Sequence, residues 1–368
     1  MKAVCKLEAL QKVIGLVGSV VPARSTQPAL QNLLLSVGKE TLTASATDLD
    51  VGLCVEVPVE KGSEPGQVGL RGADFSAIVR EADAEEIKIE ATGEAAKVRA
   101  GGASYNLVAY AGEDFPAVAD FPASAAAKLT GVELAETIDR VLFAAAREQT
   151  RYAINGIYLA LRKKELEMVA TDAHRLAVVR RKLGKAAKDE RSAIAPLKVM
   201  GEIRKIIESQ KPETVEIAFT DREIFFRVPD VVLVGRLVEG NYPKYEEAIP
   251  DDCDRKVTFD RELMLKRLRQ AMLLTSEESR SVTLTFEKGK ATIRGRTPER
   301  GEARVELEVD YPEKKVEVAF NPQYLVDVLR VLRGEGVTLL LKDASRPGLV
   351  REGKDYLYVL MPVRVREV

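Results

Sequence analysis

The sequence has few of the side chains that most often carry catalysis or bind metals. Among its 368 residues there is one histidine, His174, and the three cysteines, Cys5, Cys54 and Cys253, stand far apart without a CxxC pair. A single histidine excludes every mechanism or metal site that requires two. The isolated cysteines argue against a disulfide scaffold and a cysteine zinc site, and they favour a reducing compartment.

Charge of one sign and long apolar runs are also missing. The 56 Lys and Arg residues nearly cancel the 57 Asp and Glu residues, so the formal net charge is −1. This balance excludes an overall cationic nucleic-acid binder, although basic residues can still gather on one face. No stretch approaches 18 uninterrupted apolar residues, and Lys2, Lys6 and Glu8 interrupt the first ten. We therefore expect neither a membrane span nor a signal peptide, and a cytoplasmic protein.

Common catalytic and nucleotide-binding motifs are missing too. The sequence contains no GxxxxGK[ST] phosphate loop, no GxGxxG after a strand and no GxSxG elbow. His174 follows Asp172 in a D-x-H arrangement, which permits a base oriented by a carboxylate. Burial, or a place on a binding surface, are the alternative interpretations of His174.

What the sequence does contain is one pattern that occurs three times. A short strand followed by an amphipathic helix is predicted at residues 4–17, 129–142 and 257–272, so the period is about 125 residues. Alternating strands follow, and then a second helix is predicted at 73–81, 196–209 and 322–333. The first two copies also share the tripeptide Ala-Thr-Asp, at 46–48 and 170–172. Each copy therefore contains two successive segments, and each segment consists of a strand, a helix and further strands.

Each copy is long enough to fold as a domain. Hydrophobic residues make up 46% of the chain and charged residues 31%, which is typical of a globular protein. We predict an α+β protein with three tandem similar domains at residues 1–124, 125–251 and 252–368. The boundaries are placed in 120–127, which contains proline and alanine, and in the acidic run at 250–255. Simple duplication without a geometric purpose is the alternative explanation of the repeat.

Five segments, at corresponding places in the copies, carry a resemblance to a known family. They read Val-Pro-Ala-Arg-Ser-Thr-Gln-Pro at 21–28, Arg-Tyr-Ala-Ile-Asn-Gly at 151–156, Thr-Asp-Ala-His-Arg-Leu-Ala at 171–177, Gly-Asn-Tyr-Pro-Lys-Tyr at 240–245 and Tyr-Val-Leu-Met-Pro-Val-Arg at 358–364. Through these segments the whole chain resembles the bacterial DNA polymerase III beta subunits, the beta sliding clamps. It departs from the family at Ala173, where glycine is common, at Ala153, where some members have tyrosine, and in the additional residues 366–368.

The resemblance implies the DNA clamp fold and a function. Two identical chains would close head to tail into a ring, with helices lining the hole and antiparallel sheets outside. The ring would encircle duplex DNA and tether the replicative polymerase, so that synthesis becomes processive. The implied protein is not an enzyme and has no metal or cofactor. A hydrolase that uses His174 and scattered carboxylates, and a tandem-domain scaffold that does not encircle DNA, are the competing functions.

The implied partners follow from the same resemblance. They are double-stranded DNA without sequence preference, a second copy of this chain, the alpha subunit of the replicative polymerase, a clamp loader, and other polymerases and repair proteins that bind through short linear motifs. A ring that slides needs contacts to phosphates rather than to base edges. By resemblance, and for Arg80 by its place on a helix face, the DNA-binding residues are Arg24, Arg80, Gln149, Arg151, Tyr152 and Lys198. An ordinary solvated face of mixed charge is the alternative for any single helix.

The resemblance also implies a cleft for partner peptides, formed by two separated parts of the chain. The expected lining residues are Ile154, Thr171, His174, Arg175, Leu176, Pro243, Ala248, Val359, Leu360, Met361, Pro362, Val363 and Arg364. Aliphatic walls and an adaptable methionine suit a linear motif with a glutamine and a pair of Leu/Phe anchors. Alternatively, the apolar carboxyl-terminal residues simply complete a sheet.

For the joint between two chains, the resemblance pairs Tyr105 and Leu107 of one copy with Leu273 and Leu274 of the other. Ordinary core packing within each domain is the alternative. Nothing in a single sequence separates the two.

Overall fold

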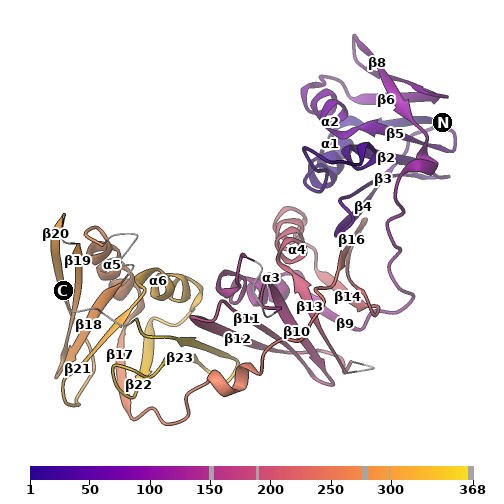
Figure 1. The fold of residues 1–368 in the computed structure, drawn as a ribbon. Helices are drawn as coiled ribbons and strands as arrows, with labels where there is room; N and C mark the ends of the chain where they lie inside the picture. The colour runs from indigo at the N-terminus through magenta and orange to yellow at the C-terminus, as the bar shows by residue number, and fades with distance from the viewer. Residues whose placement is uncertain (149–152, 188–189, 276–280, 298, 364–368) are drawn as a thin grey trace. The chain divides into compact units, whose positions relative to one another are not determined.

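The computed structural model describes residues 1–148, 153–187, 190–275, 281–297 and 299–363 of the chain (Figure 1). The chain divides into two compact units, Met1–Val132 with Lys198–Leu237, and Glu133–Leu197 with Val238–Val368. The division runs through the second copy of the repeat, so this copy contributes strands to both units. Among the described residues, no helix is long and apolar enough to cross a membrane.

The first unit is built on one sheet of twelve strands, and its strand pairs are antiparallel. In spatial order the strands are β1 (Lys2–Lys6), β6 (Glu86–Thr92), β7 (Ala95–Ala100), β8 (Ala103–Tyr110), β5 (Gly66–Arg71), β2 (Asn32–Val37), β3 (Thr41–Thr47), β4 (Val51–Pro58), β16 (Val231–Arg236), β15 (Glu223–Val228), β14 (Thr214–Phe219) and β9 (Ala127–Thr130). β4 of the first copy pairs with β16 of the second, and Leu53 lies opposite Leu233. The sheet therefore runs through the joint between these copies without an edge.

The second unit contains a sheet of eight strands and a sheet of four. The eight are β13 (Arg191–Pro196), β10 (Gly156–Arg162), β11 (Glu165–Thr171), β12 (Arg175–Lys182), β24 (Tyr356–Leu360), β23 (Gly348–Glu352), β22 (Gly336–Leu341) and β17 (Arg255–Asp260). The four are β20 (Gly301–Glu308), β19 (Lys290–Thr297), β18 (Val282–Glu287) and β21 (Val316–Phe320). β12 of the second copy pairs antiparallel with β24 of the third, so this joint is also a strand pair.

Each copy contributes two of the six helices found in the described residues. They are α1 (Leu7–Val17) and α2 (Gly72–Glu81), α3 (Gly131–Asp139) and α4 (Leu197–Gln210), and α5 (Arg261–Met272) and α6 (Pro322–Val331). Short 3-10 turns occur at η1 (Pro28–Gln31), η2 (Gly112–Asp114), η3 (Leu142–Ala144) and η4 (Tyr245–Ala248). α1 packs against α2 and α5 against α6. The prediction of three α+β copies, each with two helices between strands, is confirmed.

Local chemistry sets the helix ends. Asp260 caps α5 by accepting the N–H of Leu263 at 2.7 Å, and Asn321 caps α6 by accepting the N–H of Gln323 at 3.0 Å. The predicted helix at 322–333 is two residues too long, because Leu332 is already extended, with φ −72° and ψ 146°. Similarly, the apolar pattern at 129–142 continues past the end of α3 at Asp139 into η3, because the helical period does not distinguish an α-helix from a following 3-10 turn.

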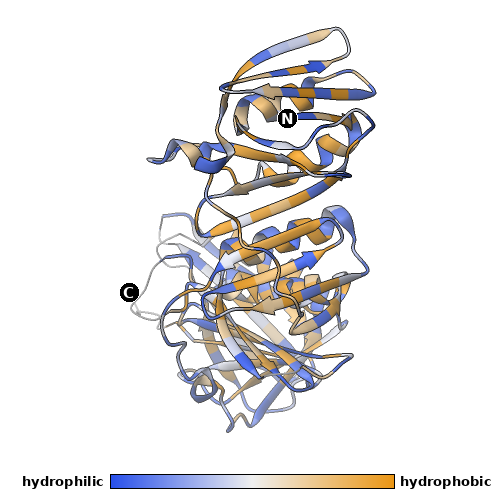
Figure 2. Ribbon diagram, turned by 90° about the vertical axis from the view of Figure 1, so that its right-hand side faces the viewer, coloured by the Kyte–Doolittle hydropathy of each residue, from blue (hydrophilic) through white to orange (hydrophobic). Residues whose placement is uncertain are grey.

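Figure 2 shows hydrophobic and hydrophilic residues alternating along many of the strands. In β7, for example, every second residue is buried. β24 differs, because all five of its residues are buried. Val359 packs in a cluster with Leu176 and Tyr245, and the ring of Tyr358 lies 5.8 Å from that of Phe143. β24 is therefore covered on both faces.

Candidate functional site

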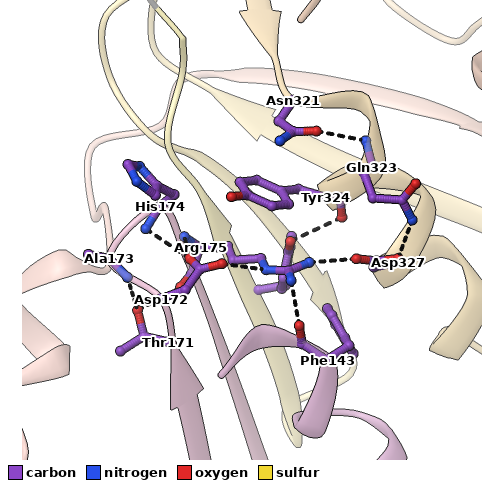
Figure 3. Close-up of polar contacts among 11 residues, drawn as sticks. Phe143, Thr171, Asp172, Ala173, His174, Arg175, Asn321, Gln323, Tyr324 and Asp327 are labelled. Carbon is purple, nitrogen blue, oxygen red and sulfur yellow. Dashed lines mark hydrogen bonds and ion pairs between the residues drawn. The ribbon is translucent and has the colours of Figure 1, made fainter. Parts of the chain in front are cut away.

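The turn between β11 and β12 is built by its own polar side chains (Figure 3). Thr171 Oγ1 donates to the carbonyl of Arg175 at 2.6 Å and accepts the N–H of Ala173 at 3.1 Å. Asp172 Oδ1 accepts the N–H groups of His174 and Arg175, each at 3.0 Å. Ala173 has a φ of 71°, in the left-handed region that favours glycine. Threonine and aspartate at these positions stabilise such a turn locally.

Arg175 lies at the centre of a cluster drawn from three parts of the second unit. Its Nε donates to Asp172 at 3.0 Å, its Nη1 donates to Asp327 of α6 at 2.6 Å, and its Nη2 donates to the carbonyl of Phe143. The guanidinium carbon lies 4.3 Å from the centre of the Tyr324 ring and 5.4 Å from that of Phe143. Figure 3 shows these groups converging on the guanidinium, while the ring of His174 points away from it.

The electrostatics of this cluster keep Arg175 charged. Burial lowers the pKa of Arg175, but Tyr358, Asp327 and Asp172 together raise it more, so its pKa lies above the usual value. Burial raises the pKa of Tyr358 well above its ordinary value, and the Tyr358 hydroxyl donates to the carbonyl of Tyr324 at 3.0 Å. The cluster is thus a largely buried cation neutralised by two carboxylates, with a neutral tyrosine beside it.

The end of β24 and the residue after it, Met361, lie directly beside this turn. Arg175 is opposite Leu360 and Leu176 is opposite Val359 in the β12–β24 pair. The N–H of Met361 then donates to the carbonyl of His174 at 2.9 Å. On the other side of the turn, the N–H of Ala146 is shared between the carbonyls of Ile154 at 3.3 Å and Thr171 at 3.2 Å. The structure therefore brings Ile154, residues 171–176 and residues 359–361 together.

The segment that connects the second and third copies is attached near this turn. The Tyr245 hydroxyl donates to Glu167 at 2.7 Å, and the Tyr242 hydroxyl donates to the carbonyl of Val169 at 3.3 Å. Burial alone raises the pKa of Glu167, but hydrogen bonds from Tyr245 and Arg180 lower it more, so this carboxylate is held charged. Tyr245 packs in one cluster with Leu176 and Val359, and Tyr242 and Ile249 pack against that cluster, so this segment lies against the same face of the sheet.

The predicted partner-binding residues differ in exposure. His174, Ala248 and Met361 are exposed; Thr171, Arg175, Pro243, Pro362 and Val363 are half-buried; Ile154, Leu176, Val359 and Leu360 are buried; and Arg364 lies outside the described residues. The buried members shape the sheet beneath the surface. Since His174 is exposed, the alternative that it is a buried core residue is wrong, whereas β24 does complete a sheet, as the alternative for the chain end proposed.

Three residues of the cluster were not found from the sequence. Phe143 follows α3, and Tyr324 and Asp327 lie on α6. The one available signal was the spacing of Tyr324 and Asp327, which places both on one face of a helix. That signal does not reveal that Arg175, 152 positions away from Asp327, is the partner.

The predicted DNA-binding residues that the structure describes all lie in the first unit. Arg24 is exposed between α1 and η1, and Arg80 is exposed in the last turn of α2, 3.6 Å from Glu81. Lys198, in the first turn of α4, forms an ion pair with Asp48, which follows β3. Gln149, Arg151 and Tyr152 lie outside the described residues.

The turn that holds Asp48 repeats the turn that holds Asp172. Thr47 Oγ1 donates to the carbonyl of Val51 at 2.9 Å and accepts the N–H of Leu49 at 3.0 Å. Asp48 Oδ1 accepts the N–H groups of Asp50 at 3.1 Å and Val51 at 2.7 Å. Leu49 has a φ of 78°, which matches Ala173. The shared Ala-Thr-Asp tripeptide thus marks the same turn in two copies.

Of the four predicted chain-to-chain contact residues, two are exposed and two are half-buried. Tyr105 in β8 is 37% exposed and Leu273, directly after α5, is 69% exposed, while Leu107 and Leu274 are half-buried. Tyr105 and Leu273 are therefore not core residues of their own domains. In the described structure, residues 103–108 of β8 pair with β7 alone, because β5 meets β8 only at Ala109 and Tyr110.

Within the parts of the chain that the structure describes, no group of three or more His, Cys, Asp or Glu side chains is arranged to hold a metal ion. Three tandem α+β domains, each with a pair of helices and joined edge to edge through their sheets, define the DNA clamp class of proteins.

Comparison with known proteins identifies the family. Residues 1–119, 128–244 and 246–364 match the N-terminal, central and C-terminal domains of the DNA polymerase III beta subunit. The chain is 33% identical to the beta sliding clamp of Caulobacter vibrioides over 375 residues, covering 99% of this chain and 100% of that protein. It is 32% identical to the beta sliding clamp of Pseudomonas putida over 362 residues, covering 97% and 98%.

A solved structure agrees with these sequence matches. The DNA polymerase III subunit beta of Pseudomonas aeruginosa matches with a TM-score of 0.93 and 32% identity, covering 99% of this chain and 100% of that one. The chain belongs to the family of DNA polymerase III beta subunits, the beta sliding clamps, which are non-catalytic processivity factors of DNA replication.

Proposed function

We propose that two copies of this chain, each with domains at residues 1–124, 125–251 and 252–368, close head to tail into a ring that encircles duplex DNA. The observation that carries the proposal is the continuity of the sheets. β4 joins the first copy of the repeat to β16 of the second, and β12 joins the second to β24 of the third. One further joint of the same kind, between two chains, closes a ring when its rotation closes.

For that further joint we choose two of the strands that have an unpaired edge, β20 and β8. In the described structure β20 pairs with β19 alone, and most of β8 pairs with β7 alone. An unpaired strand edge is a template for pairing with another chain. We place β8 of one chain, which contains Tyr105 and Leu107, against β20 of the other chain. Leu273 and Leu274, which follow α5, would lie at the same joint, and the exposed apolar side chains of both chains would become buried there.

The DNA contacts in this proposal are few and weak. Arg24, Arg80 and Lys198, together with Gln149, Arg151 and Tyr152, face phosphates and carry no base information. Lys198 also has a competing carboxylate in Asp48. Contacts of this kind weaken with salt and allow the ring to slide, so that retention on DNA depends on encirclement.

Partner proteins bind, in this proposal, beside the turn at 171–175. The exposed His174 and Met361 and the half-buried Pro362 and Val363 lie around the apolar strand pair β12–β24 and accept a short linear motif with a glutamine and Leu/Phe anchors. The alpha subunit of the replicative polymerase, an ATP-driven clamp loader, and other polymerases and repair proteins are the proposed partners. The proposed compartment is the cytoplasm.

The test is topological. Native mass spectrometry should show a dimer of 40.4 kDa chains. Clamp loaded onto nicked circular DNA by a clamp loader and ATP should remain bound through gel filtration and be lost when the circle is linearised. Leu273→Asp with Leu274→Asp should give a folded monomer that is not retained, because two charges at a buried joint are costly to desolvate. A monomeric unaltered chain, or equal retention on linear DNA, would contradict the proposal.

A further inference from the structure

Arg175 is better placed to hold its surroundings than to touch a partner. Each of its three guanidinium nitrogens donates to an acceptor within the chain, on Asp172, Asp327 and Phe143. Its side chain is 10% exposed, and the ring of Tyr324 covers one face of the guanidinium at 4.3 Å. A planar guanidinium recognises a ligand through its N–H groups and its faces, and here three of the five N–H groups and one face are occupied from within.

The acceptor that reaches Arg175 from the third copy is itself held in place. Asp327 Oδ2 accepts from Arg175 Nη1 at 2.6 Å, and Asp327 Oδ1 accepts from the amide of Gln323, also at 2.6 Å. The backbone N–H of Gln323 in turn donates to Asn321, the capping residue of α6. The carboxylate is thus fixed to the helix, and Arg175 is bound to the position of α6 (Figure 3).

From Arg175 the hydrogen bonds continue to the surface. Asp172 accepts from Arg175 through one carboxylate oxygen and from the N–H of His174 through the other. The carbonyl of His174 accepts the N–H of Met361 at 2.9 Å. His174 and Met361 are exposed, and Met361 is 40% exposed. An unbroken series of hydrogen bonds therefore links α6 to the backbone of His174 and Met361, whose side chains are exposed.

We propose that Arg175 and Asp327 are positioning residues of the partner-binding site. The pair holds the turn and the chain end in the arrangement that presents His174 and Met361 to a partner peptide. Asp327 does not touch the peptide, and Arg175 acts through Asp172. The inference rests on the proposed function, because it takes a peptide to bind beside His174 and Met361.

The first experiment measures, by fluorescence anisotropy, the affinity of the full-length protein for a labelled synthetic peptide that contains a glutamine and an adjacent Leu-Phe pair. Asp327→Asn, which removes the charge and keeps the size, should weaken binding about tenfold, as should Arg175→Lys. The double variant should bind no more weakly than either single variant, because both break the same link. Asp327→Glu restores the charge and should recover most of the affinity. The matched control is Glu335→Gln, an exposed carboxylate of the third copy, which should leave affinity unchanged.

Two outcomes of this experiment overturn the inference. If Asp327→Asn binds within twofold of the unaltered chain while Arg175→Lys loses affinity, Arg175 contacts the peptide directly. If both variants bind fully, the turn is held in place without them. In each case circular dichroism and sedimentation verify that the variants are folded dimers.

A second readout needs no peptide. The chain has six methionines, so a spectrum of methyl-labelled methionine is simple, and Met361→Leu assigns the Met361 signal. Asp327→Asn should shift the Met361 methyl signal, and Glu335→Gln should not. An unmoved Met361 signal would break the inferred link. If the unaltered chain fails to bind the peptide but the Met361 signal still shifts, the proposed partner site is wrong and the link between α6 and the chain end stands.

Discussion

The turns at residues 47–51 and 171–175 have the same internal hydrogen bonds, but they contact different groups of the next copy. In both, a threonine hydroxyl bridges the turn, an aspartate caps two N–H groups and the third residue has a positive φ. The fifth residue differs. It is Val51 in the first turn, buried opposite Gly235 of β16, and Arg175 in the second, opposite Leu360 of β24.

The difference decides how each joint between copies is held. Beside the first joint α4 packs so close to β16 of its own copy that a Cβ on Gly235, the residue opposite Val51, would lie 2.1 Å from Val199. At the second joint the space toward α6 is filled by the guanidinium of Arg175 and its carboxylates. The first joint thus combines close apolar packing with a partly exposed ion pair, Lys198 with Asp48, whereas the second contains a largely buried charged cluster. Only at the second joint does a largely buried arginine link the turn to a helix of the next copy.

The largest expected effect comes from removing the charge at the second joint. Arg175→Ala should lower the free energy of unfolding by about 3 kcal/mol, because it leaves two partly buried carboxylates without their cation. Urea denaturation at fixed chain concentration measures this loss. Combining it with Asp327→Asn should recover part of it, and a further loss in the double variant would show that the carboxylates are stabilised by other groups.

At the first joint the corresponding test is steric. Gly235→Ala should lower the free energy of unfolding by about 2 kcal/mol, because the added methyl group collides with Val199. Gly201, in the middle of α4, has no atom within 4 Å of the position of a Cβ, so Gly201→Ala should instead stabilise the chain by about 0.5–1 kcal/mol. Equal effects of the two substitutions in thermal unfolding would contradict the close approach of α4.

A smaller effect, on DNA affinity, distinguishes Asp48 from Asp172. Asp48→Asn keeps the oxygen that caps the turn and releases Lys198, so it should raise affinity for a short DNA duplex at low salt about twofold, as expected for losing an exposed ion pair. Adding Lys198→Ala should abolish the gain. Asp172→Asn is the matched control, because its turn is the same and it does not pair with Lys198. A gain in both aspartate variants would point to overall charge as the cause.

The smallest expected effect on stability concerns the positive φ that the two turns share. Leu49→Gly and Ala173→Gly should each raise the free energy of unfolding by about 0.5 kcal/mol, because the left-handed conformation costs a residue with a Cβ more than it costs glycine. Leu49 is 51% exposed, so the packing lost in Leu49→Gly offsets part of this gain, and Ala173→Gly is the cleaner test. Ala95→Gly, at an exposed position of β7, should lower stability by a similar amount. If all three glycine substitutions lower stability, the backbone entropy that glycine adds to the unfolded chain outweighs the relief of left-handed strain in the turns.

Many residues of the candidate site could be predicted from the sequence, but the contacts that organise them could not. The family motifs indicated Thr171, His174 and Met361, which the structure brings to one place. They also indicated Arg175, but as a contact residue, whereas the structure surrounds it with internal acceptors. Phe143, Tyr324 and Asp327 had no signature, because an arginine's partner can be any carboxylate or ring that the fold brings within reach.

By itself the sequence determined the parts whose interactions are local. Helices with one apolar face, caps such as Asp260, and the two Thr-Asp turns follow from side chains that bond a few positions along the chain. Only the tertiary structure decided that Asp48 meets Lys198 and that Arg175 meets Asp327, 150 and 152 positions away. The reason is physical: a charge has no preferred partner until the strand pairs β4–β16 and β12–β24 set the distances between the copies.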